Sequence, residues 1–168
     1  ESNILINFKD IKNNFLKREN FFFFILIIII FLLDRLSKLH VVKNYNEATH
    51  YINDYINLDL IWNTGIGFGF LSTESYLLYH SVTFLIGLVV LILIYVAVKL
   101  RKTSKLIFSV IIAGALGNFY DRLIYNAVPD FIDLHYNSFH WFTFNVADIF
   151  ITIGVVFLLF NDLLIKND

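Results

Sequence analysis

The sequence predicts an all-α polytopic membrane protein with four transmembrane helices and a small extracytoplasmic β-rich segment. Of its 168 residues, 58% are hydrophobic and only 16% are charged, whereas about a quarter of the residues of a typical soluble domain are charged. The mean hydropathy is +0.68. Lys and Arg concentrate in short segments that separate long apolar stretches, as expected of a chain that crosses a bilayer repeatedly.

Four apolar stretches define the predicted helices. The first contains the unbroken apolar run Phe21–Leu33, and charged residues follow it where a signal peptide would have small residues at a cleavage site. We therefore expect an uncleaved helix. The stretch from Tyr76 to Val98 is the clearest span, because it holds no Asp, Glu, Lys or Arg. The predicted organisation is a basic cytoplasmic segment, 1–19, and a single membrane-embedded domain, 20–168, with helices at about 20–42, 76–98, 106–125 and 148–165.

Two long loops separate the predicted helices. In the first, 43–75, apolar Ile56, Leu58, Leu60 and Trp62 occur at every second position, a period that is typical of a β-strand. Three glycines then interrupt this pattern, where the backbone bends or comes close to another group: Gly65, Gly67 and Gly69. The second loop, 126–145, contains the only proline.

The distribution of cations predicts the orientation. Nine of the 13 Lys and Arg residues lie in the N-terminal segment, the 99–105 turn and the C-terminal tail. The other four lie on or near the opposite side: Arg35, Lys38, Lys43 and Arg122. By the positive-inside rule, both termini are cytoplasmic and both long loops are outside.

Composition also excludes several classes of function. The net charge of −1 gives no electrostatic case for binding nucleic acid. The absence of Cys excludes disulfides, thiolate zinc sites and a cysteine nucleophile. The five histidines show no HExxH or similar spacing, so the sequence predicts no metal site.

Two predicted helices carry polar residues on one face. Asp34 and Lys38 are four residues apart and able to pair, and a structural ion pair is as good an explanation as a functional site. Gly114, Asn118 and Arg122 also recur every four residues. Small and amide residues of this kind often only pack membrane helices together.

Acidic residues follow in the second loop and at the start of the last helix. Asp130 and Asp133 lie in the loop, and Asn145 and Asp148 close to the helix start, where Asp148 is also a candidate N-cap. Asp121 is better explained as an interfacial charge. The simple structural explanations do not account for four segments bringing acids, amides and cations to the same membrane face. Two acids sharing one proton there would activate water for peptide hydrolysis.

These motifs resemble those of the lipoprotein signal peptidases (signal peptidase II). The resemblance covers the chain from Asp34 to Gly154 and rests on five motifs in the same order: Asp34-x-x-x-Lys38, Asn63–Gly69, Gly114–Arg122, Pro129–Asp133 and Phe144–Asp148. One position departs from the family pattern, since Pro129 replaces a valine. Proline fixes its own φ and removes an N–H, so it stiffens the loop or removes a donor that faces the substrate.

The resemblance implies an aspartic endopeptidase with Asp130 and Asp148 as the catalytic pair. Eight residues would support the site or bind substrate: Asp34, Lys38, Asn63, Gly65, Gly114, Asn118, Arg122 and Asn145. It implies cleavage of diacylglyceryl-modified prolipoproteins before the lipid-bearing cysteine, at the outer face of the bacterial inner membrane and without a cofactor. Membrane lipid and the family inhibitor globomycin are the other expected partners.

Three alternatives stay open at this point. A proton-coupled transporter would also place acids in the membrane, although transporters usually carry inverted repeats and ionisable residues at mid-membrane. An inert scaffold would not need both Asp130 and Asp148. Another type of membrane aspartyl protease would carry a G-x-G-D signature, which the sequence lacks.

Overall fold

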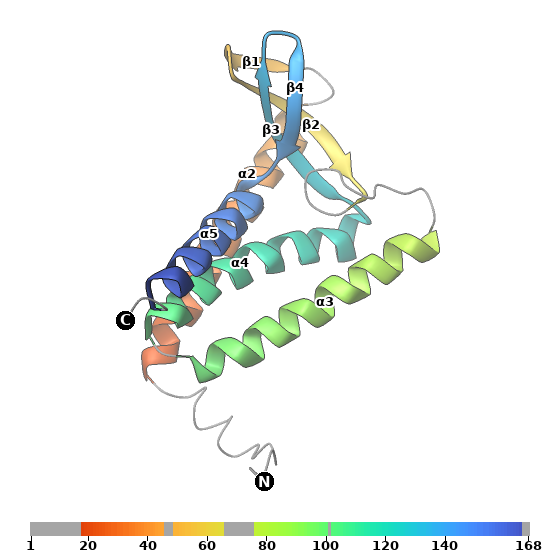
Figure 1. The fold of residues 1–168 in the computed structure, drawn as a ribbon. Coiled ribbons are helices and arrows are strands. Elements are labelled where there is room, and N and C mark those ends of the chain that lie inside the picture. Colours follow the sequence, from red (N-terminus) through yellow and green to blue (C-terminus); the bar gives the residue numbers. More distant parts are fainter. Residues whose placement is uncertain (1–17, 46–48, 66–75, 101, 166–168) are drawn as a thin grey trace.

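A computed structural model describes residues 18–45, 49–65, 76–100 and 102–165 (Figure 1). Gly67, Gly69 and most of the basic N-terminal segment lie outside this part. The described part contains four long helices, which begin and end within four residues of their predicted bounds, and one sheet. The elements are α2 (Arg18–Asn44), β1 (His50–Asn53), β2 (Ile56–Asn63), α3 (Tyr76–Lys99), α4 (Lys102–Tyr125), β3 (Val128–Tyr136), β4 (Phe139–Phe144) and α5 (Val146–Ile165).

Helix α4 is the centre of the bundle, because α2, α3 and α5 all pack against it. Two glycines permit the closest approaches. A Cβ on Gly114 would lie 2.5 Å from the carbonyl oxygen of Ala147 in α5, and a Cβ on Gly117 would lie 2.5 Å from Oδ2 of Asp34 in α2. Helix α4 therefore packs directly against the backbone of α5 and against the Asp34 side chain of α2 where α5 begins.

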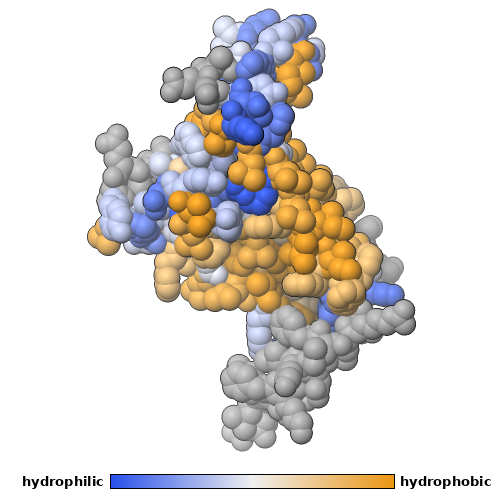
Figure 2. All heavy atoms as spheres, turned by 180° about the vertical axis from the view of Figure 1, so that it is seen from behind, coloured by the Kyte–Doolittle hydropathy of each residue, from blue (hydrophilic) through white to orange (hydrophobic). Residues whose placement is uncertain are grey.

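Helix α3 lies on the outside of the bundle and buries one narrow stripe (Tyr79, Thr83, Val90 and Ala97). Large apolar side chains cover its other faces, with Phe84 75% exposed. By length and composition, α3 and α4 are each able to cross a membrane, and Val146–Phe160 of α5 forms a shorter apolar helix. Figure 2 shows hydrophobic residues over the helical part of the molecule, seen from behind, with hydrophilic residues where the helices meet the sheet.

The β-rich segment is larger than the sequence predicted. The second long loop, 126–145, is a β-hairpin, and its two strands complete a four-stranded antiparallel sheet in the order β1-β2-β3-β4. Asn137, with φ of 53°, lies in the hairpin turn, and Asn126, with φ of 54°, follows the last residue of α4. The prediction of a mainly helical chain with a small β-rich segment is therefore confirmed, and the sheet, which projects from one end of the bundle, also takes in the second loop (Figure 1).

The strand β3 was missed because it buries polar residues and contains a proline. Asp130, Asp133 and His135 are all buried, which reverses the usual hydrophobic pattern of a strand. Pro129 is accommodated because it pairs with Trp62 of β2 on one side, while pairing with β4 begins only at Ile132. Pro129 thus lies in a strand and not in a loop.

Candidate active site

Asp130 lies at the centre of the candidate site, near the start of β3, where the sheet meets the bundle. Its side chain is 2% exposed. Asn63 Nδ2, at the end of β2, donates a hydrogen bond to Oδ2 at 2.8 Å, and Asn145 Nδ2 donates to Oδ1 at 2.6 Å. Both carboxylate oxygens are thus held by side-chain amides from two other segments.

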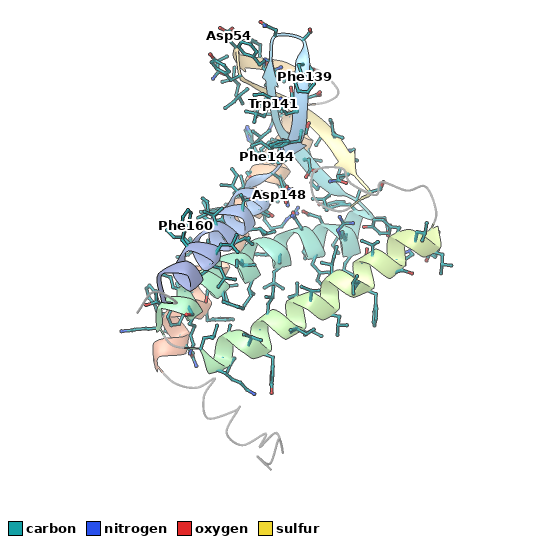
Figure 3. The ribbon with its side chains drawn as sticks, in the orientation of Figure 1. Asp54, Phe139, Trp141, Phe144, Asp148 and Phe160 are labelled. Carbon is teal, nitrogen blue, oxygen red and sulfur yellow. The ribbon has the colours of Figure 1, made fainter. Side chains whose placement is uncertain are left out.

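Asp148 is the third residue of α5, two positions later than its predicted place at the helix start. The N-cap is Asn145: its Oδ1 accepts from the Asp148 backbone N–H at 3.1 Å, and its own N–H donates to Asp148 Oδ2 at 3.2 Å. This reciprocal pair is a capping box, with Asn and Asp in the two roles. Figure 3 shows Asp148 at the end of α5 that faces the sheet.

A line of amides connects the two acids with a buried lysine. Asn118 Nδ2 donates to Asp148 Oδ1 at 2.8 Å, and Asn118 Oδ1 accepts from Lys38 Nζ at 2.8 Å. Asn145 contacts both acids. Asn118 extends this network to α2, because it bonds both Asp148 and Lys38. The structure brings together α2, α4, α5, β2 and β3 through these side chains.

Lys38 lies in a cluster of buried charges. Its Nζ donates to Asp34 Oδ2 at 2.8 Å and lies 2.7 Å from Asp121 Oδ2, an ion-pair contact that lacks the alignment of a hydrogen bond. Arg35 pairs with the other oxygen of Asp121. Asp34 also accepts from the backbone N–H of Ala147 at 2.9 Å, which joins α2 to the start of α5.

This cluster corrects one interpretation of the sequence. Asp121 is fully buried between two cations and is not an interfacial charge. The sequence did suggest the pairing of Asp34 with Lys38, but it did not show that Arg35 and Asp121 complete the cluster. The attraction between these opposite charges on neighbouring helices offsets much of the cost of removing them from water.

Arg122 positions the end of β2 and not the acids. It donates to the carbonyl oxygen of Gly65, and its guanidinium lies 5.8 Å from the centroid of the Tyr79 ring. The Gly65 N–H donates to Asn63 Oδ1 at 2.8 Å, so Arg122 reaches Asp130 through Gly65 and Asn63. Among the described residues, the second terminal nitrogen of Arg122 has no hydrogen-bond partner.

The electrostatics of Asp130 follow from this environment. Burial, and after it the negative charge of Asp148, raises the pKa of the Asp130 carboxyl to about 6. The hydrogen bonds from Asn63 and Asn145 and the charge of Lys38 act in the opposite direction. The Asp130 carboxyl therefore exchanges its proton near neutral pH, where an isolated aspartic acid would already be ionised.

Asp133 belongs to a separate cluster in the sheet. Its Oδ2 lies 2.7 Å from Nδ1 of His140, and the rings of His135 and His140 stack with centroids 5.4 Å apart. These contacts fasten the β3–β4 hairpin. Within the described part of the chain, His, Asp and Glu form no group of three that could hold a metal ion.

Sequence reasoning missed several residues that shape the site. Gly117, Ala147 and Arg35 hold α2, α4 and α5 together around the acids, and Tyr79 packs beside Arg122 and donates from its hydroxyl to the Arg122 carbonyl at 3.2 Å. A signal was present for Gly117, which lies one helical turn after Gly114. No comparable signal marks Tyr79, which is one of three tyrosines in α3.

Known proteins resemble this chain in sequence and in fold. The family described as Signal peptidase (SPase) II matches residues 26–164. The lipoprotein signal peptidase of Pelagibacter ubique is 49% identical over 140 residues, covering 82% of this chain and 84% of that protein. The lipoprotein signal peptidase of Anaplasma phagocytophilum is 42% identical over 137 residues, covering 78% and 85%.

A solved structure agrees with this relationship. It is described as a bacterial membrane enzyme studied by the in meso method, and it superposes with a TM-score of 0.71 at 25% identity, covering 84% of this chain and 87% of that one. The resemblance inferred from the five motifs is confirmed, and a transporter or an inert scaffold no longer competes as an explanation. This chain belongs to the signal peptidase II family, membrane proteases that process bacterial lipoproteins.

Proposed function

We propose that this chain is an aspartic endopeptidase in which Asp130 and Asp148 cleave the signal peptide from diacylglyceryl-modified prolipoproteins, on the N-terminal side of the lipid-bearing cysteine. The observation that carries the proposal is the contact of Asn145 with both acids. This amide donates to Asp130 at 2.6 Å and caps the helix that carries Asp148. Two carboxyl groups are thereby held in one buried network at the end of a membrane bundle.

The two acids take different parts in this mechanism. Asp130 carries the proton, because burial and the charge of Asp148 favour its neutral form. Asp148 acts as the base: its carboxylate takes a proton from water while the water oxygen attacks the scissile carbonyl carbon, and Asp130 protonates the carbonyl oxygen. When the C–N bond breaks, Asp148 gives its proton to the cysteine nitrogen, and Asp130 takes a proton back from one hydroxyl of the gem-diol intermediate. The products are a signal peptide with a new carboxyl terminus and a lipoprotein with a free amino group.

The surrounding residues keep this pair in place. Lys38 lies one amide away from Asp148, and its charge favours a single proton on the pair over two. Gly65 and Asn63 form the edge of the site next to Asp130, and Arg122 holds that edge. Globomycin is expected to bind between the acids and this edge.

The proposed topology has four membrane-spanning helices, both termini in the cytoplasm and the acids on the outer side. Helix α2 has 27 residues and α5 has 20, enough to cross a hydrocarbon core of about 30 Å. Nine of the 13 Lys and Arg residues occur in the N-terminal segment, the 99–105 turn and the C-terminal tail, which the positive-inside rule assigns to the cytoplasm. Reporters fused after Lys102 should signal cytoplasm, and those near Asn137 the outside; a cytoplasmic signal at Asn137 contradicts this arrangement.

The test is cleavage by the purified protein in detergent. The substrate is a diacylglyceryl-modified prolipoprotein, and its shift on a gel reports release of the signal peptide. Asp130→Asn and Asp148→Asn should each abolish the shift and keep the fold. Asp133→Asn is the matched control, because this buried acid in the same strand contacts His140 and not the proposed pair. Wild-type turnover in either Asp130→Asn or Asp148→Asn would refute the aspartic mechanism.

A further inference from the structure

An apolar cavity lies far from the proposed active site. Its volume is about 280 Å³, and it lies between α2, α3 and α4, where Phe23, Ile94 and Ile112 form part of its wall. Phe23 precedes Asp34 by 11 residues in α2, a separation of about 16 Å along the helix. In Figure 1 the start of α2, the end of α3 and the start of α4 come together at the end of the bundle opposite the sheet.

One cation lies at the edge of this apolar cavity. Lys105 lines the wall, donates to Asn20 Oδ1 at 2.8 Å and lies 5.8 Å from the centroid of the Phe23 ring. Within the described residues, Lys105 forms no ion pair. A partly buried ammonium group beside an apolar cavity suits an amphiphile with a negative head and a hydrocarbon tail.

The stretch of chain that forms α3 and most of α4 carries only positive charges. Lys99, Arg101 and Lys102 adjoin Lys105 in the sequence, and no Asp or Glu occurs between Tyr76 and Tyr120. Lys99 and Lys102 are exposed at the adjoining ends of α3 and α4. Lys99 and Lys102 thus add positive charge at the end of the bundle where Lys105 lies.

We propose that this cavity is a binding site for an anionic phospholipid of the cytoplasmic leaflet, with an acyl chain in the cavity and the phosphate at Lys105. The leaflet rests on the topology proposed above. Basic pockets between membrane helices on the cytoplasmic side bind anionic head groups in this way. A signal peptide is a poorer occupant, because its basic N-terminal region would be repelled by the same lysines. A zwitterionic lipid would bring a second cation next to Lys105.

The experiment compares phosphatidylglycerol with phosphatidylethanolamine of the same acyl chains. Binding of each lipid to the full-length protein in neutral detergent is measured by titration in native mass spectrometry. We expect phosphatidylglycerol to bind about five- to tenfold more tightly. Lys105→Gln should remove most of this preference, and Lys105→Arg should retain it. Lys43→Gln is the matched control, because Lys43 is an exposed lysine at the other end of α2.

A second variant tests the acyl chain. Ala97 lines the cavity and is buried, so the larger side chain of Ala97→Leu should fill part of the space and weaken the binding of both lipids. Its melting temperature in detergent shows whether the fold is kept. Glycerol 3-phosphate alone should bind far more weakly than the intact lipid, which distinguishes a lipid site from a phosphate site.

Three results would overturn the proposal: equal affinity for the two lipids, the same loss of preference in Lys43→Gln as in Lys105→Gln, or binding of glycerol 3-phosphate as tight as that of the lipid. The outcome is separable from the proposed function. Lys105→Gln should cleave prolipoprotein at the wild-type rate in neutral micelles, and a wild type that binds the anionic lipid but cleaves nothing would refute the peptidase proposal alone.

Discussion

Asn145 donates a 2.6 Å hydrogen bond to Asp130, so the residue that caps α5 also holds an acid of the neighbouring strand. The same side chain accepts from the backbone N–H of Asp148. The start of a helix and the start of a strand are therefore joined through one amide. This arrangement gives the proposed acid pair a fixed geometry before substrate arrives.

Asn145→Ala should lower the rate of cleavage strongly and the free energy of unfolding only modestly. The change removes the bond to Asp130 and the cap of α5; the first should lower kcat by about tenfold or more, and the second should cost about 1 kcal/mol. Asn53→Ala is the matched control, because Asn53 Oδ1 likewise accepts backbone N–H bonds, those of Tyr55 and Ile56, but in the turn between β1 and β2. Equal activity losses in both variants would show that Asn145 acts only on the fold. Gel-shift kinetics and melting in detergent measure the two effects.

The rate of cleavage should fall as pH rises through about 6. The proposed mechanism needs the protonated form of Asp130, whose pKa is raised to about 6, so kcat/KM should decrease above that pH with a slope approaching −1. A profile that stays flat between about pH 5.5 and 8 would contradict the assignment of the proton to Asp130.

The stability of the protein should also depend on pH through the titration of Asp130. Because the pKa of Asp130 in the folded protein lies above the usual aspartate value of 3.8, its contribution to the free energy of unfolding is full below pH 3.8 and is lost as pH rises through about 6. The full shift of the Asp130 pKa corresponds to about 3 kcal/mol in the free energy of unfolding. Asp130→Asn should lack this part of the pH dependence, and melting curves in detergent between about pH 4 and 7 compare the two proteins.

Lys38→Gln should lower both stability and activity. The variant leaves Asp34 and Asp121 fully buried without the ammonium between them, and breaking such a buried pair typically costs about 3–5 kcal/mol. Lys43→Gln, at an exposed position in the same helix, should change the melting temperature little. If Lys38→Gln melted like the wild type, the charge cluster would not stabilise the bundle.

Gly114→Ala should destabilise the junction of α4 and α5. The added Cβ would lie 2.5 Å from the backbone oxygen of Ala147, and backbone cannot move aside as a side chain can, so we expect a loss of about 1–3 kcal/mol. Gly87→Ala is the matched control. Its Cβ would meet the far end of the Phe119 ring at 2.9 Å, and this ring is able to shift. A smaller loss for Gly114→Ala than for Gly87→Ala would contradict the close approach seen here.

Arg122→Gln should loosen the edge of the site. Loss of its hydrogen bond to the Gly65 oxygen frees the segment that holds Asn63 against Asp130, so activity and melting temperature should fall together. Arg122→Lys retains the charge without the planar fork and should recover only part of the loss. An Arg122→Gln protein with unchanged melting but no cleavage would instead indicate that Arg122 contacts the substrate.

The sequence by itself determined the helices and the family. Long apolar stretches must form helices in a bilayer, since each backbone N–H and C=O has to be bonded within the segment, and these stretches predicted α2, α3, α4 and α5 closely. The spacing of four between Asp34 and Lys38 predicted their contact, because residues four apart share a helix face. The order of five short motifs identified the signal peptidase II family.

Only the tertiary structure decided what the polar residues contact. Asp121 is a buried ion-pair partner because Arg35 and Lys38 of another helix surround it, and no local pattern near Asp121 contains that information. Strand β3 forms although it contains Pro129 and buries Asp130, because β2 and the bundle supply partners for its acids. A polar residue in a strand usually marks the face that is turned to solvent, whereas the polar residues of β3 are buried. Their burial depends on segments far away in the chain.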